Sequence, residues 1–155
     1  MNENKLVDLL IAKNYKIASA ESLTGGMFAS TIVNVPNASK VIEASIVTYS
    51  NEAKQKYCGV KKETIKQFDV VSQEVVAEMA TGIAIECGAD VGVAFSGLAG
   101  PTGGTPENPV GTVCIGLFVA GNLVTFKKLF NGSRNEVREK SVDFAINKLI
   151  ELLQN

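Results

Sequence analysis

The apolar residues of this chain alternate between helical spacing and short β-branched runs. Leu6, Leu9 and Leu10 recur at the spacing of one helix face, whereas residues 90–95 form a continuous apolar run of the kind found in a strand buried on both sides. The pattern predicts helices over residues 3–13, 26–33, 51–57, 62–68, 73–87 and 134–153. It predicts strands over residues 16–20, 41–49, 90–95, 111–120 and 123–130.

The order of these elements indicates the fold class. Strands that alternate with helices pair in parallel, so the first three strands are expected to lie side by side in the same direction. A Gly121-Asn122 connection predicts a tight hairpin between the last two strands, which adds an antiparallel pair. We therefore expect residues 1–155 to form a single three-layer α/β/α domain with a mixed, mostly parallel sheet of about five strands.

The composition of the chain limits the classes of partner that we expect it to bind. The chain has 155 residues, 46% of them hydrophobic, and a net charge of −1, which argues against a non-specific nucleic-acid binder because such proteins need a basic surface. No apolar run approaches the roughly 18 residues of a membrane span, so no membrane partner is expected. The polar N-terminus has no apolar signal region, and we expect a cytoplasmic protein. The wealth of apolar residues in a small domain favours a homo-oligomer.

The sequence contains no histidine. This excludes a Ser-His-Asp or Cys-His catalytic unit and a histidine-ligated zinc site within the chain. The cysteines Cys58, Cys87 and Cys114 form no C-x-x-C pair, so neither a zinc ribbon nor a thioredoxin-type motif is expected. Any general base must therefore be Asp, Glu, Lys, Tyr, Cys or a water.

Three unusual segments follow predicted parallel strands, at residues 21–26, 48–54 and 96–101. Because ligands of open α/β sheets bind at the carboxyl ends of the strands, we expect these segments to converge on one site. In the first segment, Ser22 is a candidate nucleophile or, alternatively, a helix cap or a hydroxyl that is hydrogen-bonded within the turn. The amides of Thr24, Gly25 and Gly26 are candidates to bind an oxyanion or another anion at the start of the next helix.

The second segment offers two further candidates. Without histidine, a serine nucleophile needs another base, and a buried lysine with a lowered pKa serves in some enzymes. Lys54 is the candidate here, with a solvated surface lysine as the alternative. Tyr49 is a candidate proton relay or hydrogen-bond donor, and otherwise a ring packed at the strand end.

Two more groups are candidates to bind substrate. The third segment is rich in glycine but matches neither the P-loop nor the dinucleotide fingerprint, and we interpret it as a backbone cradle for substrate or phosphate rather than a flexible crossover. Its candidate residues are Ser96, Gly97, Gly100, Pro101, Gly103 and Gly104. Arg134 and Arg138 share one face of the last helix and are candidates to hold a phosphate or carboxylate, or else to pair with Glu136 and Glu139.

Four segments of the chain, in this order, resemble motifs of the CinA C-terminal domain family. They are residues 20–26 (AESLTGG), 47–54 (VTYSNEAK), 96–104 (SGLAGPTGG) and 109–113 (PVGTV). The enzymatic members of that family are nicotinamide-nucleotide amidohydrolases, so the resemblance implies hydrolysis of nicotinamide mononucleotide (NMN) to nicotinate mononucleotide and ammonia, in recycling of pyridine nucleotides.

The resemblance also implies roles for individual residues. By motif position, Ser22 is the nucleophile, Lys54 its base and Tyr49 an assisting group, with the glycine-rich loop and an arginine holding the ribose phosphate. No metal or organic cofactor is implied. Two alternatives remain open, which are a Ser-Lys amidase acting on a different nucleotide-like amide and a nucleotide-binding module without catalysis.

Overall fold

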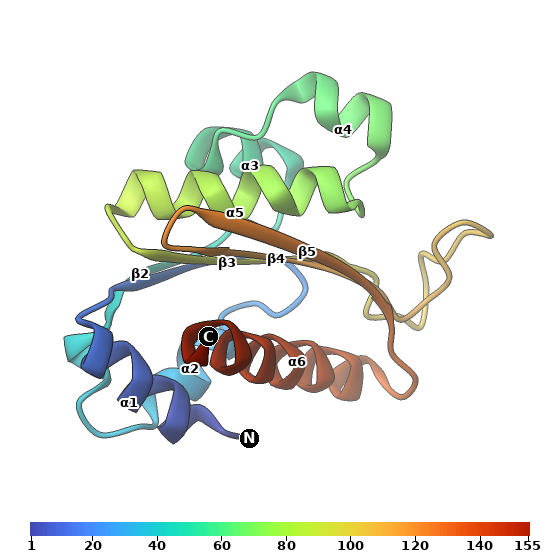
Figure 1. The fold of residues 1–155 in the computed structure, drawn as a ribbon. Coiled ribbons are helices and arrows are strands. Elements are labelled where there is room, and N and C mark those ends of the chain that lie inside the picture. Colours follow the sequence, from blue (N-terminus) through green and yellow to red (C-terminus); the bar gives the residue numbers. More distant parts are fainter.

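Five strands form one sheet in the order β2-β1-β3-β4-β5, with helices on both faces (Figure 1). The computed structural model describes all residues, Met1–Asn155. The strands are β1 (Ile17–Glu21), β2 (Ile42–Val47), β3 (Val91–Gly97), β4 (Thr112–Val119) and β5 (Asn122–Leu129). The helices are α1 (Glu3–Lys13), α2 (Met27–Val33), α3 (Asn51–Cys58), α4 (Lys62–Phe68), α5 (Gln73–Cys87) and α6 (Arg134–Gln154), with a short 3₁₀ turn at Ala38–Lys40.

The expected mixed sheet is confirmed. β1 pairs in parallel with β2 and β3, whereas β4 pairs antiparallel with β3 and β5. Only β4 therefore runs against the other strands. The register places Glu21 opposite both Val47 and Phe95, so the carboxyl ends of the three parallel strands lie at the same edge of the sheet.

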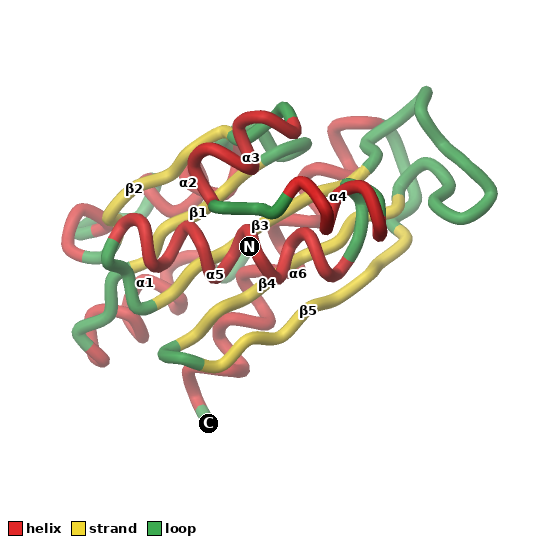
Figure 2. The backbone as a smooth tube through the Cα atoms, turned by 90° about the horizontal axis from the view of Figure 1, so that it is seen from above, coloured by secondary structure: helices red, strands yellow, loops and turns green.

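The helices divide into two layers around the sheet. α3, α4 and α5 cover one face, and α1, α2 and α6 cover the other. Figure 2 shows the same arrangement from above. α5 lies very close to the sheet because Gly92 and Gly116 face it, and a Cβ at either position would overlap a carbonyl oxygen of the helix. The larger apolar core lies on the α6 side, where Phe28 packs against Phe95 with ring centroids 5.8 Å apart.

Local signals set most helix ends. Ser72 begins α5 by accepting a hydrogen bond from Val75 N at 3.2 Å, and Gly88 ends it in the left-handed conformation, so the expected bounds of this helix are confirmed. The last hairpin differs from the expectation by one residue. Val119 pairs with Asn122, so the two turn residues are Ala120 and Gly121, both at positive φ, as this type of tight hairpin requires.

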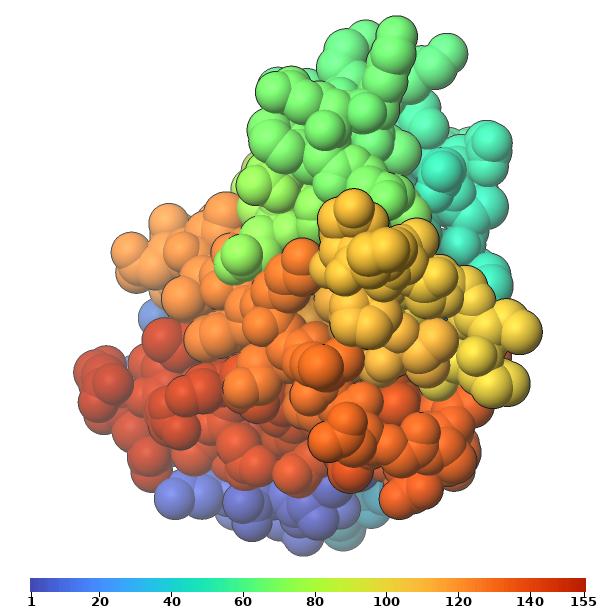
Figure 3. Space-filling model, turned by 90° about the vertical axis from the view of Figure 1, so that its right-hand side faces the viewer, coloured from blue at the N-terminus to red at the C-terminus, as the bar shows by residue number.

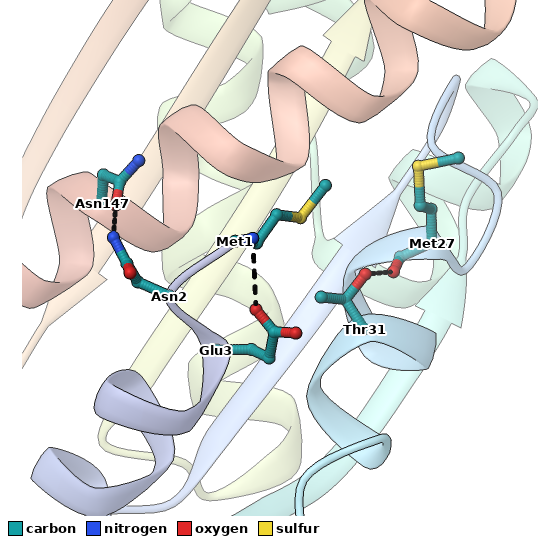
Figure 4. Close-up of polar contacts among 6 residues, drawn as sticks. All are labelled: Met1, Asn2, Glu3, Met27, Thr31 and Asn147. Atoms are coloured by element: carbon teal, nitrogen blue, oxygen red, sulfur yellow. Dashed lines mark hydrogen bonds and ion pairs between the residues drawn. The ribbon is translucent and has the colours of Figure 1, made fainter.

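The N-terminus lies against the last helix, on the α1–α6 face (Figure 4). Asn2 Nδ2 donates to Asn147 Oδ1 at 2.9 Å, and the terminal amine of Met1 lies 3.8 Å from a carboxylate oxygen of Glu3. The Asn2–Asn147 hydrogen bond therefore attaches the N-terminus to α6. No helix combines the length and the apolar character needed to cross a membrane.

Candidate active site

Lys54 is buried beside Ser22. The Nζ atom of Lys54 lies 3.3 Å from Ser22 Oγ and 3.3 Å from the backbone oxygen of Tyr49. The lysine is only 2% exposed, and no Asp or Glu forms an ion pair with it. Burial lowers the pKa of Lys54 from its ordinary value, opposed in part by the nearby Cys58 thiol. The alternative of a solvated surface lysine is therefore excluded.

Helix α3 carries the lysine inward. Ser50 begins this helix, with its hydroxyl accepting a hydrogen bond from Ala53 N at 3.0 Å. Lys54 and Cys58 are four residues apart, so they share the helix face that is turned toward α5 and the sheet. The amine of Lys54 thus extends from α3 to Ser22, at the end of β1.

Ser22 directly follows β1 and is 8% exposed. It does not cap α2: no backbone N–H of that helix donates to the Ser22 hydroxyl, whose only hydrogen-bond partner is Lys54 Nζ. The turn between them is closed by a hydrogen bond from Gly25 N to Ser22 O at 3.0 Å, and Gly25 and Gly26 both have positive φ. The helix-cap interpretation of Ser22 is therefore wrong, and its hydroxyl is free to face Lys54.

Glu21 is the residue that caps α2, and the sequence reasoning assigned it no role. Its carboxylate accepts hydrogen bonds from Phe28 N at 2.9 Å and Ala29 N at 3.1 Å, and it is fully buried. Ser45 of β2 donates to the same carboxylate at 3.1 Å. Glu21 thus occupies two amides of the first turn of α2, whereas of the amides that we expected to bind an anion (Thr24, Gly25 and Gly26) only Gly25 N has a partner, Ser22 O. An acidic residue inside an otherwise apolar strand was the available signal.

Successive residues of a strand point to opposite faces of the sheet. Glu21 points to the α2 side, where its hydrogen-bond partners lie, and Ser22 points to the α3 side, where Lys54 lies. Glu21 therefore anchors the end of β1, while Ser22 directs its hydroxyl toward Lys54.

Tyr49 lies at the pocket mouth and is 60% exposed. Its hydroxyl is 3.3 Å from Arg134 Nη2 and makes no hydrogen bond with Ser22 or Lys54. Arg134 Nη1 also donates to Gly100 O at 2.7 Å. This arrangement favours direct proton transfer between Ser22 and Lys54 over a relay through the tyrosine.

The two arginines of α6 have different surroundings. Arg138 donates from Nε to Leu23 O at 2.8 Å and from Nη2 to Thr24 O at 3.1 Å, so it is bound to the turn after β1. Arg134 is exposed and reaches the glycine-rich loop. Neither pairs with Glu136 or Glu139, which bind Ser133 and Asn135 instead, so the ion-pair alternative is wrong.

A pocket of about 180 Å³ opens over Ser22 and Lys54. Of the predicted site residues, it brings together Ser22, Tyr49, Lys54, Ser96 and Gly97. The others do not line it: Thr24, Gly25, Gly26, Gly100, Pro101, Gly103, Gly104, Arg134 and Arg138. The remaining walls come from Leu23, Asn51, Val70, Val71 and Leu98, which sequence reasoning missed.

Val70 and Val71 carry no chemical signal in the sequence. They precede α5 and reach the pocket because Ser96 Oγ donates to Val70 O at 2.8 Å and Asn108 Nδ2 to Val71 O at 3.4 Å. These contacts join the start of α5 to the end of β3 and to the loop that follows it. The predicted cradle residue Ser96 thus helps to form the pocket wall.

The loop between β3 and β4 is held at its base. Leu98 N donates to Thr112 O at 2.9 Å, and Gly111 N donates to Leu98 O at 2.7 Å. Its tip projects from the sheet and lies beside α4 and α5 in the space-filling view (Figures 1 and 3). A hollow of about 670 Å³ lies there, next to Thr105 and Lys127, and it does not include Ser22 or Lys54. Gly103 and Gly104 line neither this hollow nor the pocket over Ser22 and Lys54.

Comparison with known proteins identifies the family of this chain. A profile described as the CinA C-terminal domain matches residues 1–153. The chain belongs to this family. The CinA domain is 50% identical over 144 residues to a CinA-like protein from Kosmotoga olearia and 45% identical over 147 residues to a competence-damage inducible protein from Clostridium tetani. It covers 35% and 36% of those relatives, with 93% and 95% of its own length aligned, so it spans about a third of the curated relatives it matches.

Solved structures of similar length share the fold. A CinA superfamily protein from Klebsiella pneumoniae superposes with a TM-score of 0.94 at 35% identity, covering 98% of the CinA domain and 95% of that chain. A competence/damage inducible protein from Agrobacterium tumefaciens gives 0.91 at 32% identity, covering 100% and 97%. The mixed sheet with helices on both faces is thus the architecture of the superfamily.

Proposed function

We propose that this CinA domain hydrolyses the carboxamide of NMN, giving nicotinate mononucleotide and ammonia in the recycling of pyridine nucleotides. The observation that carries the proposal is the buried Lys54 amine, 3.3 Å from Ser22 Oγ and without an acidic partner. Burial lowers the pKa of Lys54, which raises the fraction of neutral amine that is able to act as a general base. The resemblance of the four sequence motifs supplies the substrate.

The first half of the reaction acylates the serine. Neutral Lys54 takes the proton of Ser22, and Ser22 Oγ forms a bond to the carboxamide carbon, whose oxygen becomes an oxyanion. When the tetrahedral intermediate collapses, the C–N bond breaks and the Lys54 ammonium returns its proton to the departing nitrogen. Ammonia leaves, and a nicotinoyl ester remains on Ser22.

The second half regenerates the enzyme. Neutral Lys54 takes a proton from water, and the resulting hydroxide oxygen attacks the ester carbon. Collapse of this second intermediate returns the Lys54 proton to Ser22 Oγ and releases the carboxylic acid, which loses a proton to solvent to give nicotinate mononucleotide. The cycle consumes one water: its oxygen and one hydrogen enter the acid, and its other hydrogen replaces the serine proton that left with ammonia.

The nucleotide part of the substrate would lie outside the pocket. At about 180 Å³, the pocket is smaller than the ~300–1,000 Å³ sites that enclose drug-sized ligands, and it suits the ring and its amide. Arg134 at the mouth has no acidic partner and is a suitable ligand for the phosphate, with Tyr49 beside it. In this proposal, Gly100 contributes by holding the arginine through its carbonyl.

The test is ammonia release from NMN by the purified protein, compared with Ser22→Ala and Lys54→Ala. Ser30→Ala and Lys56→Ala are matched controls, because both residues are exposed and lie on the helices next to the site. We expect both site variants to lose at least about 100-fold in rate, the lower range for removal of a general base, and the controls to match the wild type.

Other outcomes would redirect the proposal. Ammonia release that survives Ser22→Ala would identify another nucleophile or an activated water. Binding of NMN without ammonia release from the wild type would indicate a nucleotide-binding module. Release from a different nucleotide-like amide, but not from NMN, would keep the Ser-Lys mechanism and change the substrate.

A further inference from the structure

Arg138 holds the backbone of the turn that follows Ser22. It lies in α6, 115 residues from Leu23, and donates two hydrogen bonds to consecutive carbonyl oxygens of the turn, from Nε to Leu23 O and from Nη2 to Thr24 O. No acidic side chain pairs with it. Its charge and its forked geometry are thus directed at two peptide groups.

These bonds also orient the amides of the same peptide groups. In a trans peptide, the C=O and the following N–H point in opposite directions. With Leu23 O bound by Arg138, the N–H of Thr24 in the same peptide group points away from Arg138. The Thr24 carbonyl likewise fixes Gly25 N–H, which donates to Ser22 O at 3.0 Å.

Several nearby amides are already occupied. Phe28 N and Ala29 N donate to Glu21, Met27 N donates to Thr24 O, and Gly25 N donates to Ser22 O. The amides of Leu23, Thr24 and Gly26 donate to no acceptor within the protein. Of these three, only the Thr24 amide belongs to a peptide group whose carbonyl oxygen Arg138 binds, and Thr24 is two residues after the candidate nucleophile.

We propose that Arg138 is a positioning residue, which holds the Leu23–Thr24 peptide so that Thr24 N–H stabilises the oxyanion formed when Ser22 attacks. The inference rests on the proposed function for the identity of the nucleophile. It gives Arg138 a role at the reacting carbonyl instead of the phosphate contact expected from the sequence. The role requires arginine, because a lysine has a single nitrogen and cannot span both carbonyls in a fixed plane.

The test uses 3-pyridylboronic acid, which has the ring of the proposed substrate but no phosphate. Ser22 Oγ adds to the boron and the serine proton passes to Lys54. The resulting tetrahedral boronate is an anion, and one of its hydroxyl oxygens lies where the oxyanion would form. Its affinity is measured for the wild type, for Arg138→Lys and for Lys140→Gln, an exposed cation of the same helix. Ser22→Ala gives the background without covalent addition.

We expect Arg138→Lys to bind the boronate about 10- to 100-fold more weakly, less than the ~10²–10³-fold effect of deleting an oxyanion donor outright. We expect kcat for NMN to fall by a similar factor with little change in KM, and Lys140→Gln to match the wild type. A phosphate-binding role would give the opposite result, with KM for NMN raised and boronate affinity unchanged, and would overturn the inference.

A second measurement needs no variant at Arg138. In the wild type, the amide proton resonance of Thr24 should move downfield when the boronate binds, and a resonance that stays in place would also overturn the inference. Absence of Ser22-dependent boronate binding would do the same. If the boronate effects appear but NMN releases no ammonia, the proposed substrate fails while the positioning role stands.

Discussion

Gly82 of α5 lies directly against the carbonyl oxygen of Cys58 at the end of α3. A Cβ atom at position 82 would overlap that oxygen, so the two helices cross with no side chain between their backbones. Lys54 is one turn earlier in α3, and its reach to Ser22 depends on how close α3 lies to α5. A residue with no reactive group therefore helps to set the Ser22–Lys54 distance.

Gly82→Ala should push α3 outward and move Lys54 away from Ser22. We expect a loss of about 1–3 kcal/mol in unfolding free energy, as for other overpacked sites, together with at least a tenfold loss of kcat. Denaturant unfolding and ammonia release would measure the two effects. Glu86→Ala, on the exposed side of the same helix, is the control. Unchanged stability and rate would show that the crossing tolerates a methyl group.

The reaction rate should rise with pH. The active form of Lys54 is the neutral amine, and burial lowers the pKa of Lys54 below its ordinary 10.5, so kcat/KM should increase as the pH rises through the lowered value. A pH profile of kcat/KM from acid conditions to about pH 10 tests this. A rate that falls with rising pH over that range would contradict a lysine base.

Lys54→Met should remove activity and stabilise the fold. At neutral pH the native state must hold a buried, unpaired amine, whereas methionine suits the site. Because the native pKa of Lys54 is lowered, the unfolded chain binds more protons between that value and 10.5, so wild-type stability rises with pH across this window. The advantage of Lys54→Met should therefore shrink with increasing pH.

Denaturant unfolding of both proteins at about pH 7 and about pH 10 would measure this difference. Lys56→Met, at an exposed position of the same helix, should show no such pH dependence. A stability gain for Lys54→Met that is equal at the two pH values would argue that the lysine does not change its charge between them.

Arg134→Gln should weaken the binding of the substrate phosphate and leave the chemical step unchanged. Losing a charge-assisted hydrogen bond costs about 1.5–3 kcal/mol, so we expect KM for NMN to rise roughly 10- to 100-fold with kcat nearly unchanged. Nicotinamide riboside, which lacks the phosphate, should be hydrolysed equally well by wild type and variant. Kinetics on both substrates would show this, and equal effects on the two would assign the arginine to another role.

Much of this site followed from the chain because its signals are local. Ser50 and Ser72 mark helix starts, and the glycine-rich turn after β1 marks a change of direction. Once the first three strands are read as parallel, their carboxyl ends must meet at one edge, which brings the segments of Ser22, Lys54 and Ser96 together.

Other features depend on contacts between distant segments. Glu21 is bound by amides seven and eight residues away, and the role of Arg138 depends on carbonyls more than a hundred residues earlier. Val70 and Val71 are ordinary apolar residues until Ser96 and Asn108 bind their carbonyls. The local sequence does not predict these contacts, because tertiary packing sets the partner of each residue.

The sequence by itself determined the order of the elements, the mixed sheet and the residues that could serve as nucleophile and general base without histidine. Only the tertiary structure decided that Lys54 is buried and without an acidic partner, that Arg134 is exposed at the pocket mouth, and that Arg138 is bound to the turn. The physical reason is that residue type fixes which protons and charges are available, whereas burial and the partners brought by packing decide their pKa and orientation.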